Sequence, residues 1–395
     1  MVRGRSAAYD ARMEPSALPI FELGVLLLLA ALAGWLARRF RLPAIVGYLA
    51  IGLLVSPFTP GYVADHDKLQ LLADVGVVLL LFEVGIEVDV GRLRKEHGQI
   101  LWAAPLQTLI TSAIATGAGL VAGLPPFGAG AVGLGVALSS SVVIVNITRS
   151  RRRTTTRATE EALLAWSVLQ DITGVGLAII LLAVFGSAGR DPHFAVAGLV
   201  AFVALAIIAA WALPHVLRRL RAEHDLFLII SVASGLALAG AGAIAAGIPL
   251  ALAAFVAGLA ITESHDAAEA RRRLLPFRDL FAVLFFVAIG TLIDPDAFVQ
   301  GLPWLALIVG LVIVAKVLVA YVLARLIGLR AQPAQLAIGL GQVGEFSFVL
   351  GSAAAAAGAI GPEIYAAILG AVVVTIIGST VIVRLGGQPH EAIAA

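Results

Sequence analysis

The chain has 395 residues, of which 60% are hydrophobic and 13% charged, and its mean hydropathy is +1.01. A soluble domain would carry about 25% charged residues, so the composition excludes a soluble protein and favours a membrane protein. The net charge is +2 and the basic residues form short dispersed clusters, which excludes a nucleic-acid partner. The absence of cysteine excludes disulfides and thiolate metal sites, and we expect no cofactor.

Residues 1–17 form a polar N-terminal leader without a signal-peptide cleavage pattern, and Met13 is a plausible alternative start. We expect residues 18–395 to form a single transmembrane unit. A membrane span needs about 20 mainly apolar residues, which predicts an all-α polytopic fold with about 13 transmembrane helices. The predicted spans are 18–38, 43–57, 69–88, 98–124, 127–148, 158–187, 194–217, 225–246, 249–263, 276–293, 301–325, 332–358 and 362–385.

The basic residues between these spans predict their orientation. The chain has 27 Lys and Arg residues. Of those located after a span, all come after an odd-numbered span except Lys68 and Arg190. The positive-inside rule therefore places the N-terminus outside and the C-terminus in the cytoplasm. The spans also divide into two six-helix halves of opposite direction around a linker helix at about 194–219. This division is typical of inverted-repeat transporters.

Two spans contain segments that weaken a continuous helix. The fifth has the adjacent hydroxyls Ser139–Ser141, which compete for backbone groups. The twelfth has three glycines within Gly339–Gly344. Interruptions at matching positions of the two halves predict two crossing broken helices at a transporter's central site, and ordinary packing of small residues is the alternative. The glycine run matches G-x-G-x-x-G, but it lies inside an apolar span, so we exclude a dinucleotide site.

Asp171 lies near the middle of the sixth span, where a carboxylate is so costly that it is rarely without function. Desolvation disfavours its ionised form, so we expect it to bind a proton and a monovalent cation in alternation. Ser167 and Gly174 share its helix face. Gln170 adds a neutral oxygen, which predicts electroneutral exchange, although a hydrogen bond to a neighbouring helix explains Gln170 equally well. For Asp171 the alternative is a structural acid paired with a buried base.

Lys316 is the one basic residue deep inside a predicted span, where it needs a carboxylate, a carbonyl or deprotonation. Asp171 and Glu345 are its candidate partners. A switching pair with Asp171 would belong to the mechanism, and a fixed pair would belong to the scaffold. Glu345 is interpreted as a second acid near the crossing or as a helix-end cap. Glu83 stays ambiguous, and Glu87 is interpreted as part of an interfacial charge cluster.

Several segments resemble the membrane domain of the Kef-type potassium–proton antiporters, which belong to the second monovalent cation:proton antiporter family. These segments are Leu81–Asp89, Ala137–Ser141, Leu169–Asp171, Phe285–Gly290 and Gly339–Phe346. The resemblance covers nearly the whole chain from about residue 18. Its most specific parts are the Gln-Asp pair and the Gly-Gln-x-Gly-Glu-Phe run.

The resemblance implies a sodium/proton-antiporter-like fold that works by an elevator motion. It implies a dimer scaffold at about 18–97 and 225–300 and a mobile core at about 98–187 and 301–387. It also implies a homodimer embedded in membrane lipid. Family members with Gln-Asp in the sixth span resemble potassium exchangers, and those with Asp-Asp resemble electrogenic sodium exchangers. Kef proteins usually carry a soluble nucleotide-binding regulatory domain, which we expect to be absent from this chain.

We therefore predict a secondary antiporter of the cell's inner membrane, and not an enzyme, that exchanges H⁺ for K⁺ or Na⁺. The predicted ion ligands are Asp171, Gln170, Ser140, Ser141 and Thr173. The residues predicted to tune the charge and support the crossing are Lys316, Glu345 and Gln342. Two alternatives stay open: an inverted-repeat symporter of an organic anion, and a cation channel or sensor with a static core.

Overall fold

The computed structural model describes residues 17–40, 42–59, 66–87, 98–140, 144, 155–185, 192–220, 222–261, 267–329 and 331–385. Within these residues all regular structure is helical, which confirms the predicted all-α fold. In hydrocarbon every backbone polar group must find a partner inside the protein, and a helix meets this need within one segment.

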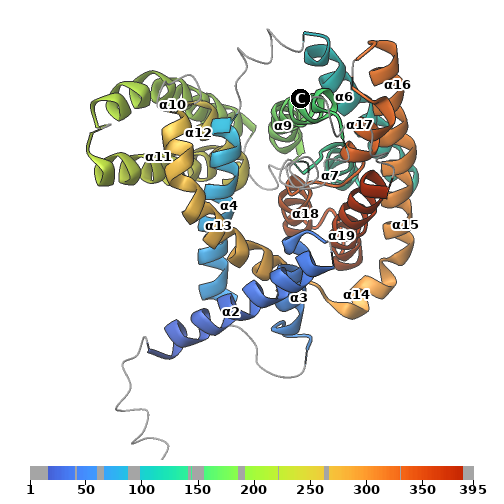
Figure 1. Ribbon diagram of the computed structural model, residues 1–395, viewed down its shortest axis with the longest axis horizontal. Helices are drawn as coiled ribbons and strands as arrows, with labels where there is room; N and C mark the ends of the chain where they lie inside the picture. Colours follow the sequence, from blue (N-terminus) through green and yellow to red (C-terminus); the bar gives the residue numbers. More distant parts are fainter. Residues whose placement is uncertain are drawn as a thin grey trace, which may run out of the picture.

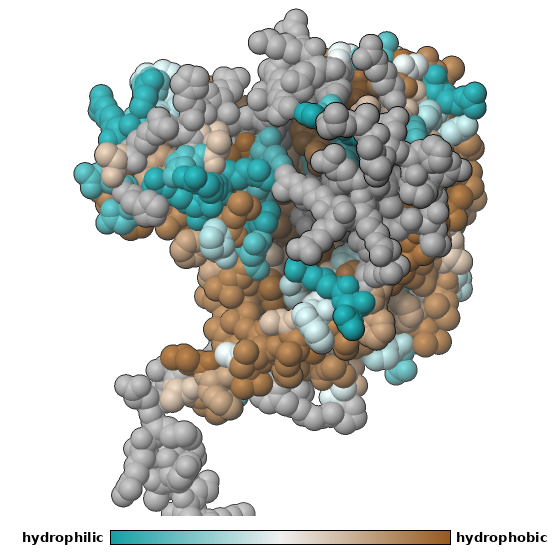
Figure 2. Space-filling model, viewed as in Figure 1, coloured by the Kyte–Doolittle hydropathy of each residue, from teal (hydrophilic) through white to brown (hydrophobic). Residues whose placement is uncertain are grey.

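Nine of the described helices are long and apolar enough to cross a membrane, and four shorter apolar helices accompany them. Each predicted span contains helix, while the number of crossings stays a prediction. Large apolar side chains such as Trp35, Ile207 and Trp211 are exposed on the outside. Figure 2 accordingly shows hydrophobic flanks with hydrophilic residues gathered mainly in the upper part of the view. This surface suits contact with lipid.

Seven helices pack into a group that we call the α4 unit, seen at the left and lower centre of Figure 1. They are α2 (Ala17–Arg39), α3 (Ala44–Leu54), α4 (His66–Glu87), α10 (Pro192–Arg219), α11 (His224–Ala246), α12 (Leu250–Leu259) and α13 (Ala267–Thr291). α4 packs against both α12 and α13, and α3 packs against α13.

Paired glycines allow these close contacts. A Cβ atom at Gly85 of α4 would collide with the carbonyl oxygen of Phe255, and one at Gly258 of α12 would collide with that of Phe82. Gly52 of α3 and Gly290 of α13 approach each other's helix in the same way. Small residues let helix backbones approach closely where lipid offers no hydrophobic driving force for association.

The remaining described helices form a second group, the α9 unit, at the right of Figure 1. They are α6 (Ile100–Val121), α7 (Pro126–Ala137), α9 (Arg157–Phe185), α14 (Pro295–Gln300), α15 (Leu302–Leu311), the π-helix η1 (Val312–Val317), α16 (Leu318–Leu326), α17 (Pro333–Leu340), α18 (Phe346–Ala356) and α19 (Pro362–Leu385). α15, η1 and α16 follow one another without a gap.

Aromatic side chains line a contact between the two units. Phe346 of α18 meets Phe255 of α12 edge-on, with ring centroids 5.9 Å apart. Phe348 of α18 meets Phe285 and Phe286 of α13 at 6.5 and 6.3 Å. The side of α18 that faces the α4 unit is therefore apolar.

One predicted boundary is wrong. The span expected at 276–293 belongs to α13, which begins at Ala267. The arginines of its first turns favoured a later start, but Arg271 and Arg278 pair with acids of α4. Partners on another helix therefore allow charged residues to continue a helix that hydropathy alone would have shortened.

Candidate functional site

Two helix breaks meet inside the α9 unit. α7 ends at Ala137 and the chain continues in a non-helical conformation through Ser140, while α17 ends at Leu340 and α18 begins at Phe346. The Gly344 N–H donates to the Leu138 carbonyl at 3.0 Å, and the Ser139 hydroxyl donates to the Leu340 carbonyl at 2.8 Å. The helix thus breaks at both predicted places, and the two breaks are hydrogen-bonded to each other.

Gly344 is required by the closeness of this crossing. A Cβ atom there would lie 2.7 Å from the backbone carbonyl carbon and oxygen of Ser139, and 3.0 Å from the Ser140 nitrogen. Since backbone atoms on the other segment cannot turn aside as a side chain would, a larger residue would push the two segments apart.

Lys316 lies at this crossing and is fully buried. Its Nζ donates to the Leu138 carbonyl at 2.7 Å and to the Gln342 carbonyl at 2.5 Å. The carbonyls at a helix end have no partner in their own helix and carry partial negative charge. Among the ion pairs of the described residues, none joins Lys316 to Asp171 or Glu345. Carbonyl oxygens from both breaks therefore satisfy its ammonium group in this conformation.

Asp171 lies on the face of α9 that packs against the end of α7. Its side chain is 1% exposed, and its Oδ1 has no hydrogen-bond partner. Gly174, one turn further along, lies against the Leu138 side chain, with which a Cβ atom would collide. The buried Ser167 hydroxyl, one turn earlier, also has no partner. A buried carboxylate oxygen without a donor is costly, and a proton or a cation would remove that cost.

Gln170 is fully buried beside Asp171 and belongs to a chain of hydrogen bonds that sequence reasoning missed. Its Nε2 donates to Oε1 of Gln107 on α6, which also accepts from Nε1 of Trp166 at 3.2 Å. Gln107 Nε2 donates to the Thr111 hydroxyl at 2.9 Å, which donates to the Ala315 carbonyl at 2.7 Å. The signal for this chain in the sequence was the spacing of Gln107 and Thr111, one helical turn apart within a predicted span.

Two further predicted residues lie at the crossing. Gln342 is buried; its Nε2 donates to the Gly339 carbonyl at 3.1 Å and its Oε1 has no partner. Glu345 precedes the first residue of α18, makes no side-chain capping bond there, and interacts with the buried Ser140. The carboxyl group of Glu345 therefore faces the other break and does not cap its own helix.

Thr173, another predicted ligand, is not brought to this cluster. The Thr173 hydroxyl donates to the Leu169 carbonyl of its own helix at 2.7 Å, and two residues along an α-helix face nearly opposite directions. Ser141 lies outside the described residues. A further contact that sequence reasoning missed is the Thr375 hydroxyl of α19, which accepts from the Val343 N–H at 3.0 Å and holds the second break.

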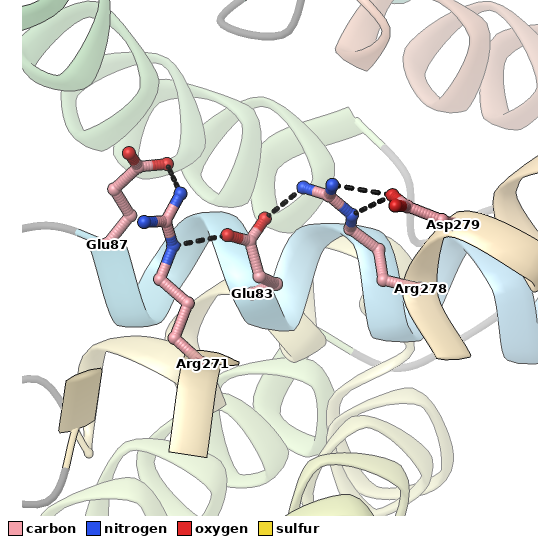
Figure 3. A network of polar contacts seen from close by, with 5 residues as sticks. All are labelled: Glu83, Glu87, Arg271, Arg278 and Asp279. Atoms are coloured by element: carbon pink, nitrogen blue, oxygen red, sulfur yellow. Dashed lines mark hydrogen bonds and ion pairs between the residues drawn. The ribbon is translucent and has the colours of Figure 1, made fainter. Parts of the chain in front are cut away.

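A different acidic residue, Glu83 of α4, is also 1% exposed, and it is fully paired (Figure 3). One carboxylate oxygen accepts from Arg271, and the other accepts from Arg278 at 2.7 Å. Arg271 also pairs with Glu87 at 2.8 Å, and Arg278 with Asp279 at 2.6 Å. Glu83 thus joins α4 to α13, and Glu87 belongs to the same cluster.

Comparisons with known proteins agree with this architecture. The model of the family described as sodium/hydrogen exchanger, transmembrane, matches residues 27–385. The putative cation/proton antiporter YbaL of Escherichia coli K12 is 30% identical over 338 residues, which are 82% of this chain and 60% of that protein. The chain thus spans under two thirds of that relative's length.

A solved structure supports the fold. The sodium proton antiporter MjNhaP1 from Methanocaldococcus jannaschii at pH 8 has a TM-score of 0.71 with this chain at 18% identity. The similarity covers 94% of this chain and 98% of the other.

Proposed function

This chain belongs to the family of transmembrane sodium/hydrogen exchangers, and we propose that it exchanges protons for a monovalent cation as a secondary active antiporter. The family consists of transporters and not of enzymes. The observation that carries the proposal is Asp171 Oδ1, a buried carboxylate oxygen without a donor. It lies one helical turn from Gly174, which packs against Leu138 of the first break. A group in this state binds either H⁺ or a cation, and binding one displaces the other.

Unpaired buried oxygens on α9 and at the crossing support a cation as the exchanged ion. Besides Asp171 Oδ1, three such side-chain oxygens have no partner: Gln170 Oε1 and Ser167 Oγ on α9, and Gln342 Oε1 at the crossing. Hard cations are bound by oxygen ligands, and neutral oxygens can replace the hydration shell of K⁺. With one acid and a neutral Gln170, we propose electroneutral exchange of H⁺ for K⁺, in line with the Kef-type resemblance.

Lys316 would hold the crossing together during exchange. It donates to carbonyls on both breaks, and its charge lies close enough to Asp171 to act on it electrostatically. When Asp171 is protonated, this positive charge favours loss of that proton. In this proposal Glu345 would tune the same site from the other side of the crossing.

An elevator motion of the α9 unit against the α4 unit would carry the ion. The apolar contact of Phe346 and Phe348 with α12 and α13 supports this proposal, because an apolar surface breaks few hydrogen bonds when it slides. The ion pairs of Glu83 with Arg271 and Arg278 support a rigid α4 unit, which would form the scaffold of a homodimer. The glycine contacts also support an inverted repeat. In such a repeat α3 and α4 of the first half correspond to α12 and α13 of the second, so the contact of α4 with α12 corresponds to that of α13 with α3. We place the protein in the inner membrane with its N-terminus outside.

The test is proton flux in liposomes that contain the protein and a pH-sensitive dye. We expect added K⁺ to drive proton movement without creating a membrane potential, and Asp171→Asn to abolish it. Asp74→Asn is the matched control, because Asp74 is a half-buried acid of α4 that bonds to Gln70 at 2.8 Å. Exchange by Asp171→Asn at the parent's rate would contradict the proposal.

The same liposomes separate the alternatives. Trials with Na⁺, Li⁺ and Rb⁺ define the preferred cation. Uptake that depends on an organic anion would favour a symporter. Unitary currents in a planar bilayer, or no coupling of protons to any cation, would favour a channel or a sensor.

A further inference from the structure

The hydrogen bonds around Gln107 have only one possible direction. The indole N–H of Trp166 can donate but not accept, so the atom it meets at 3.2 Å must be the oxygen of the Gln107 amide. At the other end the Ala315 carbonyl can only accept, so the Thr111 hydroxyl gives its proton to that carbonyl and accepts from Gln107 Nε2. Both ends therefore assign the same orientation to the Gln107 amide.

This orientation decides which atom of Gln170 is left over. Because Gln107 presents an oxygen, Gln170 must turn its NH₂ group toward Gln107. Its Oε1 then points away from Gln107, where it is buried without a partner. The opposite orientation would leave an NH₂ group in that place, and an NH₂ group repels a cation.

The same chain reaches the segment that carries Lys316. Ala315 lies in the π-helix η1, directly before Lys316. A π-helix shifts the backbone hydrogen-bond pattern and is frequent at functional sites. A continuous chain of hydrogen bonds through α6 thus joins Gln170, the residue before Asp171, to the backbone of the residue before Lys316.

We propose that Gln107 is a positioning residue for the cation, which holds the Gln170 amide so that its carbonyl oxygen is presented to a dehydrated monovalent cation bound at Asp171. Trp166 sets the direction of this amide from outside the site. Thr111 links it to η1. Gln107 itself does not touch the ion. This inference rests on the proposed antiporter function. It goes beyond that function because it gives Gln107, Trp166 and Thr111 the role of orienting the Gln170 amide.

The experiment measures K⁺-driven proton flux in liposomes as a function of K⁺ concentration. Gln107→Leu keeps a similar volume but removes every hydrogen bond. We expect its half-maximal K⁺ concentration to rise about three- to tenfold, the usual effect of one lost polar contact. The maximal rate at saturating K⁺ should stay within about twofold, since Gln107 acts on ion binding. Trp166→Phe should give a smaller rise, because the bond to Thr111 alone then fixes the orientation of the Gln107 amide.

Gln107→Glu is the conservative variant. As a neutral acid it can accept from Trp166 and Gln170 and donate to Thr111, so its half-maximal K⁺ concentration should return toward the parent value. Thr108→Val is the matched control on the same helix. The Thr108 hydroxyl is buried and donates to the Ala104 carbonyl of its own helix at 2.9 Å, so its loss should leave K⁺ dependence unchanged.

A double variant separates positioning from general packing. If Gln107 acts through Gln170, then Gln107→Leu should not raise the half-maximal K⁺ concentration further in a Gln170→Leu background. Effects that multiply would overturn the inference, as would a parental K⁺ dependence in Gln107→Leu. If Gln107→Leu does not fold, Trp166→Phe compared with Thr108→Val decides, and equal K⁺ dependence in these two would overturn it. Failure of the antiporter function would appear separately, as exchange that survives Asp171→Asn.

Discussion

Glu83 and Asp171 are equally buried, each 1% exposed, yet their surroundings differ. Glu83 is held by two arginines and joins α4 to α13, whereas Asp171 Oδ1 has no donor although Lys316 lies close by and bonds elsewhere. Burial alone therefore does not mark an ion site in a membrane protein. What distinguishes the two acids is whether the protein supplies the partner, and in the proposed function the unfilled place at Asp171 takes a proton or a cation.

The largest effect on stability should come from the paired acid. Glu83→Gln removes the negative charge that pairs with both Arg271 and Arg278. We expect it to lower the free energy of unfolding by about 2–4 kcal/mol, somewhat below a fully buried pair because both arginines reach water. The check is the melting temperature in detergent.

Glu161→Gln is the matched control for Glu83→Gln. It removes an i,i+4 pair with Arg157 in which the arginine side chain is 85% exposed, so its cost should stay below about 0.5 kcal/mol. Equal melting temperatures for the two variants would show that the Glu83 pairs do not stabilise the α4 unit.

Gly344→Ala should have the next largest effect, and it acts on the crossing alone. The added Cβ would force apart backbone segments that now lie 2.7 Å from its position. We expect a loss of about 1–3 kcal/mol together with most of the exchange activity. Gly378→Ala on α19 has open space around its Cβ position, so it should be neutral or slightly stabilising. Parallel losses in both variants would argue against a tight crossing.

The smallest effect on stability should come from Asp171→Asn. The substitution removes a buried carboxylate whose Oδ1 has no donor, which is unfavourable in the folded protein. The melting temperature should therefore match or exceed that of the parent, while proton exchange is lost. A drop in melting temperature similar to that of Glu83→Gln would mean that Asp171 is a structural acid, and the contrast between the two carboxylates would disappear.

Much of this architecture could be predicted from the sequence. The apolar segments indicate the helices, because hydrocarbon forces backbone pairing within each segment. The polar and glycine-rich runs at Ser139 and Gly341 indicate the two breaks. Asp171 and Lys316 stand out because ionisable groups are rare in such segments.

The partners of these groups could not be predicted. Lys316 was expected to need a carboxylate, a carbonyl or deprotonation, and the sequence named only the carboxylates of Asp171 and Glu345 as candidates. Backbone carbonyls hold it instead, and since every residue carries one, the sequence does not single them out. Gln107 and Thr375 are single polar residues on other helices, and only the packing shows that they reach Gln170 and Val343. The start of α13 was missed for the same reason, since the acids that pair with Arg271 lie far away in the sequence.

Competition between K⁺ and protons at Asp171 tests the central claim most directly. The half-maximal K⁺ concentration for exchange, or for thermal stabilisation of the protein, is measured at several pH values roughly one unit apart. If one carboxylate binds both ions, protons occupy it at low pH, and this concentration should rise up to about tenfold for each unit by which the pH falls. Asp171→Asn should show no K⁺ dependence at any pH. A half-maximal K⁺ concentration that is the same across the whole pH range in the parent would contradict the account.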